Sequence, residues 1–183
     1  SSSVTDITRL SVLARANYSY RSRYFVTLTA RYDGSSNFSA GNKWAFFPAA
    51  AFKWTISNES WMTAAKNGGL TNLSLRLSAG RSGNDAIAAY MSIPTLTSEV
   101  SSWMLGNYQP ISYYNTRLAN NNLTWEVTDS YNLGLNFMAF KERVNLEVDA
   151  YTSRTSDLLL AMKSNRAIGY DTYFTNVGST RNT

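Results

Sequence analysis

The chain has 183 residues, of which 44% are hydrophobic, 14% aromatic and only 16% charged, with a formal net charge of +5. It contains no cysteine and no histidine, which argues against a disulfide framework, a thiolate metal site and histidine-based catalysis. The 17 lysines and arginines are scattered rather than clustered, so the charge pattern does not suggest a nucleic-acid partner.

Residues 10–32 predict two antiparallel strands joined by a tight connection at 21–23. From Tyr24 to Tyr32, apolar and polar side chains alternate, which is typical of a strand with one apolar face. The two tyrosines would stand roughly 26 Å apart along the strand, or about 20 Å after a 45° tilt. That spacing approaches the apolar band of a transmembrane β-barrel, although strands of a soluble sandwich alternate as well.

A Gly-, Ser- and Asn-rich loop over 33–43 leads to a third expected strand over 47–56. Pro48 cannot donate to a ladder, so we expect it near the start of this strand or at a bulge. The cluster at 57–60 resembles a helix N-cap, and Gly68 and Gly69 follow soon after. Together they predict a short helix between them.

The rest of the chain predicts further strands separated by connections that alternate between short and long. We expect strands over 70–83, 125–140 and 144–151, an irregular stretch over 84–122, and a last loop over 158–176 before a further strand. No run of about 18 apolar residues occurs, so no transmembrane helix is predicted.

The parity of the strands places the short connections at one end and the long ones at the other. In an outer-membrane barrel, short turns are periplasmic and long loops are extracellular. Asp129 falls on the apolar parity of its strand, which predicts a bulge there or a position above the lipid.

Short motifs occur in a fixed order along nearly the whole chain. They are Asp33-Gly34-Ser35-Ser36, Phe38, Lys43-Trp44, Phe47-Pro48, Trp54, Glu59, Gly83-Asn84, Trp125-Glu126, Asn132-Leu133-Gly134, Gly169-Tyr170 and Asn176-Val177-Gly178. This order resembles the barrel signature of SusC/RagA-type TonB-dependent outer-membrane transporters. Two positions depart from it: Ala49 stands where the family usually has serine, and residues 179–182 give only part of its closing motif.

The resemblance implies an all-β fold in which about six to eight antiparallel strands form part of a transmembrane barrel wall. The whole barrel would have about 22 strands and a plugged lumen, with one short helix in a periplasmic connection and long extracellular loops. Residues 1–183 would then be a partial barrel domain in the outer membrane of a Gram-negative bacterium. A signal peptide, the plug and the remaining strands would lie outside it.

The function implied by the resemblance is TonB-dependent active import of glycan oligosaccharides or peptides. A SusD-like surface lipoprotein would act as lid, and TonB would act through an N-terminal part that this chain lacks. The outer-membrane lipid would surround the wall, and no cofactor or metal is expected. Two alternatives stay open: a secreted carbohydrate-binding β-sandwich and a TonB-dependent siderophore receptor.

Four charged residues fall on the polar strand faces and would point into a barrel lumen: Arg31, Arg76, Glu147 and Asp149. They could hold the plug to the wall through salt bridges, or line the path of the substrate. Glu147 and Asp149 could also imitate the carboxylate pair of a glycosidase, but lumen-lining carboxylates are the favoured interpretation and no enzyme is predicted.

The candidate ligand-contacting side chains are aromatic residues of the long stretch, namely Trp103, Tyr108, Tyr113 and Tyr114. They could stack on sugar rings or receive a partner lid, or they could pack the loop against its neighbours. Asp33–Asn37 carries oxygen atoms at a calcium-like spacing, but a turn motif is the favoured account.

Overall fold

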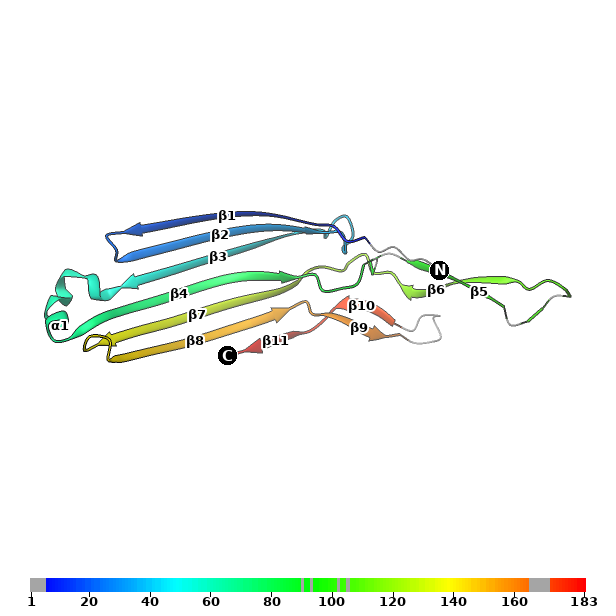
Figure 1. Ribbon diagram of the computed structural model, residues 1–183. Coiled ribbons are helices and arrows are strands. Elements are labelled where there is room, and N and C mark those ends of the chain that lie inside the picture. The colour runs from blue at the N-terminus through cyan, green and yellow to red at the C-terminus, as the bar shows by residue number, and fades with distance from the viewer. Residues whose placement is uncertain (1–5, 90, 93, 102, 105, 165–171) are drawn as a thin grey trace.

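The computed structural model describes all residues except 1–5, 90, 93, 102, 105 and 165–171. The described part is built from strands and one short helix (Figure 1). The elements are β1 (Arg9–Tyr20), β2 (Tyr24–Ser35), β3 (Trp44–Thr55), α1 (Thr63–Asn67), β4 (Leu70–Asn84), β5 (Thr95–Val100), β6 (Ile111–Leu118), β7 (Glu126–Ala139), β8 (Val144–Ser156), β9 (Leu159–Lys163), β10 (Thr172–Asn176) and β11 (Ser179–Asn182), with 3-10 turns η1 (Ile56–Asn58) and η2 (Ser60–Met62) before the helix.

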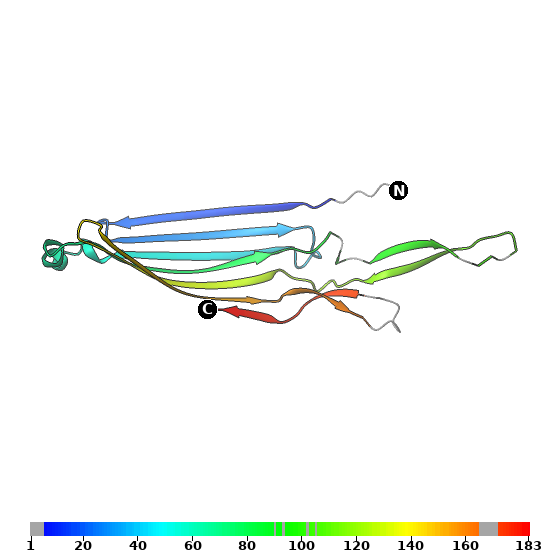
Figure 2. The same cartoon turned by 60° about the horizontal axis from the view of Figure 1, so that its bottom comes forward.

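Seven strands form one curved antiparallel wall in the order β1-β2-β3-β4-β7-β8-β11 (Figure 2). Its ladders have one irregularity in the described residues, between Leu70 and Asn72. A smaller sheet, β5-β6-β10-β9, lies beyond the loop end of the wall, and in it β10 and β6 pair in parallel over two residue pairs. No helix in the described part of the chain has both the length and the hydropathy to cross a membrane.

The wall has one apolar and one polar face, because the register keeps like side chains opposite one another. One row on the apolar face is Val26, Phe52, Leu77, Leu133 and Ala150, each directly opposite the next. The adjacent row on the polar face is Thr27, Ala51, Ser78, Asn132 and Tyr151. The single-sheet wall therefore carries the alternation that the sequence predicted for its separate strands.

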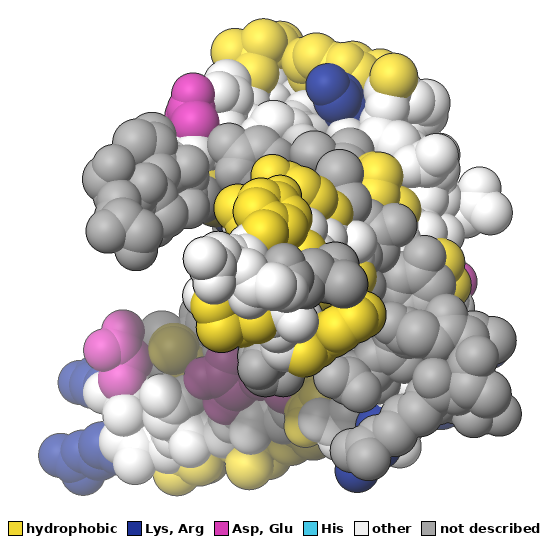
Figure 3. Space-filling model, turned by 90° about the vertical axis from the view of Figure 1, so that its right-hand side faces the viewer, with side chains coloured by type: hydrophobic (Ala, Val, Ile, Leu, Met, Phe, Trp, Pro, Cys, Tyr) yellow, Lys and Arg dark blue, Asp and Glu magenta, His cyan; other side chains and the backbone are white. Residues whose placement is uncertain are grey.

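No second sheet covers the apolar face of the described wall. Large side chains on it, such as Leu28, Leu133 and Val148, are about half exposed. Viewed from the loop end, hydrophobic side chains lie along the top of the molecule, in the centre of the view and at its lower edge (Figure 3). A β-sandwich would bury this face against another sheet, so the sandwich alternative is wrong.

The tight connection between β1 and β2 is a three-residue turn over 21–23, because Tyr20 pairs with Tyr24, and its first two residues lie in the left-handed region. The Arg23 amide donates to the Tyr20 carbonyl at 3.0 Å, and Arg21 and Ser22 have φ of 49° and 52°. Left-handed residues in a tight hairpin connection match the twist of the flanking strands. The turn at 140–143 between β7 and β8 has four residues, and Phe140, Lys141 and Glu142 are left-handed. The short connections predicted between these two pairs of strands are therefore confirmed.

The boundaries of the third strand and the place of Pro48 differ from the prediction. β2 runs on to Ser35, and residues 44–46 pair with its end, so β3 begins before Phe47. Pro48 is therefore the fifth residue of an unbulged strand. The ladder between β3 and β4 begins at Ala49, so the missing N–H lies where that pairing has not yet started.

Of the two alternatives predicted for Asp129, the bulge is wrong, and the position above the lipid stays a prediction. The ladder between β4 and β7 is regular there, with Asp129 directly opposite Arg81. The aspartate stays on the apolar face because Arg81 pairs with it at 2.7 Å.

The long stretches that were expected to be irregular contain strands of their own. Residues 84–122 include the β5–β6 hairpin, and 158–176 include β9 and β10 before the further strand β11. The described side chains of β5, β6, β9 and β10 are exposed or half-buried. Alternation of apolar and polar residues is weak where no face is buried, so the period of these strands could not be recognised.

The helix is confirmed, but its start is not. The cluster at 57–60 forms 3-10 turns, and α1 starts at Thr63 without a side-chain N-cap. At its end, the amides of Gly68 and Gly69 bond the last carbonyls, as the paired glycines predicted.

Glu59, in this connection, is a half-buried anchor at the short-turn end of the wall. Its carboxylate accepts hydrogen bonds from the Tyr24 hydroxyl (2.7 Å), the Trp54 indole (3.1 Å) and Arg23 (3.1 Å). The hydrogen bond from Tyr24, then that from Trp54, and then the charge of Arg23 lower the pKa of Glu59 below its ordinary value of 4.5, against the opposing effect of burial. The Trp54 and Glu59 motif positions thus form one contact.

This anchor predicts acid-sensitive stability. A lowered folded-state pKa gives stabilisation that is present above the unfolded pKa and is lost as the pH falls through the folded value. Below about pH 4.5, we expect the melting temperature of the wild-type protein to fall by more than that of Glu59→Gln. The melting temperature is measured as heat-induced loss of β-structure. Glu142→Gln, at an exposed turn of the same end, is the control and should follow the wild type. Equal acid sensitivity in Glu59→Gln would contradict the assignment.

Candidate functional site

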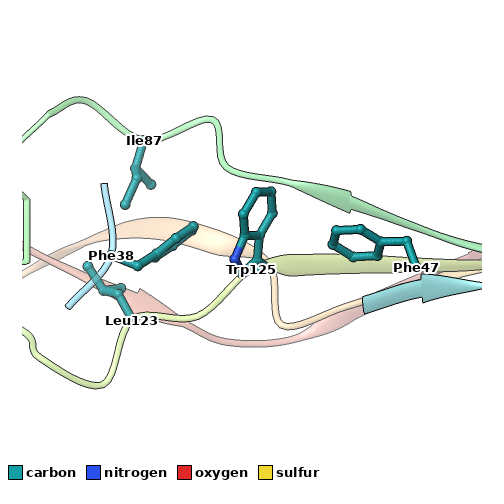
Figure 4. Close-up of a cluster of buried hydrophobic side chains, with 5 residues drawn as sticks. All are labelled: Phe38, Phe47, Ile87, Leu123 and Trp125. Carbon is teal, nitrogen blue, oxygen red and sulfur yellow. The ribbon is translucent and has the colours of Figure 1, made fainter. Parts of the chain in front are cut away.

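At the loop end of the wall, five buried apolar side chains form a core on the polar side of the sheet (Figure 4). Trp125 lies at its centre, with Phe38 tilted against it at 5.3 Å and Phe47 edge-on at 5.5 Å between ring centroids. Ile87 and Leu123 complete the cluster. These residues come from three connections and from β3, so the cluster fixes the loops to the wall.

The Asp-Gly-Ser-Ser-x-Phe motif belongs to this core and not to a free loop. Asp85 accepts hydrogen bonds from Ser35 Oγ and Arg9 Nε, both at 2.7 Å. Asn37 Nδ2 donates to the carbonyls of Asp85 and Ile87, each at 3.2 Å. Burial raises the pKa of Asp85, but the hydrogen bonds from Arg9 and Ser35 and the charge of Arg9 together bring that pKa below its usual value.

The other positions of this motif also have structural contacts. Ser36 Oγ accepts from the Thr8 amide at 3.0 Å. Gly34 leaves room for the ring of Trp44, which would come within 2.8 Å of a Cβ there. Asp33 Oδ2 pairs with Arg31 at 2.7 Å. The described residues hold no group of three or more carboxylates or histidines that could bind a metal.

The Asn176-Val177-Gly178 motif meets the Trp125-Glu126 motif at the same end. Asn176 Oδ1 accepts from the Thr124 amide at 2.9 Å, and its Nδ2 donates to the carbonyls of Thr124 and Asp157, also at 2.9 Å. Glu126 accepts from Asn84 and from the Leu159 amide. Gly178 follows with φ of 82°, which favours glycine.

Motifs that are far apart in the sequence therefore assemble into one network, in which they join loops to one another and to the strand ends. Their contacts are structural: each polar atom named above is directed at another part of the chain. The Gly169-Tyr170 motif lies outside the described residues.

A second charged group lies on the polar face, nearer the middle of the wall. Arg76 Nη2 donates to Glu147 and to both oxygens of Asp149, at 3.1 and 3.2 Å for the latter. Gly134 lies between these strands, directly opposite Arg76 and Asp149, and a Cβ there would overlap both side chains. Three of the four charged residues predicted to face the lumen are therefore in contact, with Glu147 and Asp149 both bound by the guanidinium group of Arg76.

Arg31 does not join the Arg76 group. Besides Asp33, it lies over the ring of Phe47, 5.5 Å from its centroid, and so belongs to the loop-end core. Both carboxylates of the considered glycosidase pair, Glu147 and Asp149, are held by Arg76.

The candidate aromatic residues lie in or next to the β5–β6 hairpin, which extends away from the wall (Figure 1). Trp103, Tyr108 and Tyr113 are each about two-thirds exposed, and Tyr114 donates to Glu99 at 3.2 Å. Contact with a ligand or lid stays a prediction, and packing of these side chains against other loops stays a prediction as well.

Sequence reasoning missed a charged row on the apolar face. Arg81, Asp129, Arg154 and Arg181 are directly opposite one another in β4, β7, β8 and β11. The off-parity position of Asp129 was a signal of it, but the other three could be aligned only once the register was known.

Comparison with known proteins assigns the wall to a family. The model of the TonB-dependent receptor-like β-barrel matches residues 1–183. The chain belongs to this family. The TonB-dependent receptor P3 of Formosa agariphila is 36% identical over 182 residues, covering 100% of this chain and 18% of that protein.

Two further relatives agree with this assignment. The TonB-dependent receptor SusC of Bacteroides thetaiotaomicron is 35% identical over 185 residues, covering 97% of this chain and 18% of SusC. The RagAB peptide transporter superposes with a TM-score of 0.82 at 27% identity, covering 96% of this chain and 19% of that one. The chain therefore spans about a fifth of the length of each of these relatives.

The family confirms the predicted barrel fold and the resemblance to SusC and RagA. TonB-dependent receptors are outer-membrane barrels and are receptors or transporters, not enzymes, as the sequence indicated. In such a barrel the apolar face of the wall is the outward one.

The buried core at the loop end predicts that two tryptophan variants, one in the core and one exposed, will differ in stability. Trp125→Ala should lower stability by about 3–5 kcal/mol, because it empties the centre of a buried cluster. It should also expose the loops to protease in the folded receptor. Trp103→Ala, at an exposed site, should change neither. Equal stability and equal protease resistance of the two variants would show that the cluster does not hold the loops.

Proposed function

We propose that this chain is part of the barrel wall of a transporter that imports oligosaccharides or peptides across the outer membrane at the expense of TonB-transmitted energy. The observation that carries the proposal is the continuous pair of faces, one apolar and one polar, in a chain whose whole length aligns with SusC-type receptors. A wall with an uncovered apolar face needs lipid outside and a polar filling inside.

The polar face would line the lumen. There the Arg76 group carries one positive and two negative charges, so it offers an excess negative charge to whatever fills the lumen. Arg76 Nε is buried and has no hydrogen-bond partner among the described residues. These features support contact between this face and a plug. The alternative role of the same residues is to line the path of the cargo.

The β5–β6 hairpin would meet a lid or the cargo on the outside. Its exposed Trp103, Tyr108 and Tyr113 are broad apolar surfaces with polar tips, which suit both sugar stacking and protein contact. RagAB is described as a peptide importer, and a SusD-like surface lipoprotein is the partner that the resemblance to SusC and RagA suggests. TonB would act through parts of the protein that lie outside this chain.

An uptake assay tests the proposal. Cells lacking the receptor should lose import of fluorescent oligosaccharides or peptides too large for porins, and an uncoupler should abolish import in the wild type. Loss of growth on iron–siderophore complexes with unchanged uptake of both cargo classes would contradict the proposal and favour a siderophore receptor.

The exposed aromatic residues predict a weaker, specific effect. Trp103→Ala combined with Tyr108→Ala should reduce cargo affinity or lid association about 2- to 10-fold, the range expected for lost aromatic contacts of about 0.5–1.5 kcal/mol. Tyr18→Ala, exposed on the outward face of β1, is the control and should leave uptake unchanged. Equal uptake by all three proteins would remove these aromatics from the site.

A further inference from the structure

The outward face carries a row of four charged side chains at the point where the apolar surface ends. The row runs across β4, β7, β8 and β11 as Arg81, Asp129, Arg154 and Arg181, in direct cross-strand register. It holds three positive charges and one negative charge on a face that otherwise meets hydrocarbon. A charge on the lipid side of a barrel is tolerated near an interface rather than at the midplane.

The position of the row fits the outer interface. Outward apolar residues Leu73, Phe137 and Leu146 lie in one cross-strand row of β4, β7 and β8. The charges come eight positions further along each strand, a span of roughly 26 Å, or about 20 Å after tilting, which approaches the height of an apolar band. The charges lie towards the long-loop end, which is the extracellular end of an outer-membrane barrel.

Only two of the four charged side chains in the row form a salt bridge with each other. Arg81 pairs with both oxygens of Asp129, at 2.7 and 3.0 Å. Arg154 and Arg181 are exposed and directly opposite one another, and in the described part of the chain neither forms a salt bridge. Like charges directly across a ladder repel one another, so an anion between the two guanidinium groups would be held by both.

The surface around these arginines is hollowed. A depression of about 400 Å³ is lined by Asp129, Tyr131, Thr152, Arg154, Ser179 and Arg181. All six lie on the outward parity of their strands. Hydroxyl groups and guanidinium groups together suit a phosphate carried on a sugar.

An apolar groove continues from this depression along the wall. It measures about 710 Å³ and shares Tyr131 and Thr152 with the depression. Small side chains such as Ala50, Ala79 and Ala150 form its floor between larger ones. Arg154 and Arg181 form no salt bridge in the described residues, although Arg181 Nε donates to Thr152 Oγ1 at 3.3 Å. A polar hollow with two such cations that opens into an apolar groove has the two parts of a site for a charged lipid.

We propose that this row binds a phosphorylated glycolipid of the outer leaflet, with a phosphate between Arg154 and Arg181 and an acyl chain in the alanine-floored groove. The site rests on the placement of the wall in an outer membrane and is independent of the cargo. It would keep one lipid on the wall when the surrounding annular lipids exchange.

Lipid retention by the full-length receptor tests the proposal. The receptor is placed in phosphatidylethanolamine nanodiscs and titrated with monophosphorylated lipid A or with its dephosphorylated form, and bound lipid is counted by native mass spectrometry. The wild type should retain the phosphorylated form at least 10-fold more tightly. Arg154→Gln with Arg181→Gln should abolish this preference, while Arg154→Lys should keep part of it.

Two controls separate lipid binding from other roles of the arginines. Arg143→Gln, an exposed arginine at the opposite end of the wall, should leave the preference intact, and heat-induced unfolding should show that all variants are folded. Equal retention of the two lipid forms by the wild type would overturn the proposal. Unchanged lipid retention in the double variant, together with weaker self-association of the receptor, would overturn it in favour of a contact between barrels.

Discussion

A backbone amide within a bilayer has no water to bond, so every strand of a membrane-spanning wall must be satisfied by its neighbours. Here that constraint appears as seven strands in nearly unbroken antiparallel register, with the single irregularity beside Leu70, at the short-turn end. Because the side-chain period of a strand is two, an unbroken register also fixes which side chains face outward on every strand at once. The apolar and polar faces follow directly from the ladder.

At both ends of the strands, side-chain contacts hold the connecting segments against the wall. At the short-turn end, Glu59 collects three hydrogen bonds and ties the helical connection to β2 and β3. At the loop end, Trp125 and its neighbours form a small buried core, and Asn176 joins two connections through backbone atoms. Charges then occur in two kinds of place: the Arg76 group on the polar face, and the arginine row where the apolar face ends.

The sequence was sufficient to predict the strands that have one apolar and one polar face, because alternation can be read within a single strand. The pairing of the strands then confirmed these faces. It was also sufficient for the turns at 21–23 and 140–143 and for the family resemblance. It could not show that β2 continues through Asp33 and Ser35, because their polar side chains are buried by partners from residues far along the chain. The outward arginine row was hidden for the same reason: its members come from four strands, and only the pairing aligns them.

The most direct test of the two-faced wall is site-directed spin labelling along β7, from residue 130 to 137, in the full-length receptor in lipid bilayers. Oxygen, which concentrates in the hydrocarbon, should collide most with labels at Tyr131, Leu133, Leu135 and Phe137. Collisions should fall at each intervening position, giving a period of two. A flat profile, or one with its maxima at Asn132 and Asn136, would contradict the assignment of the faces and with it the account of the wall.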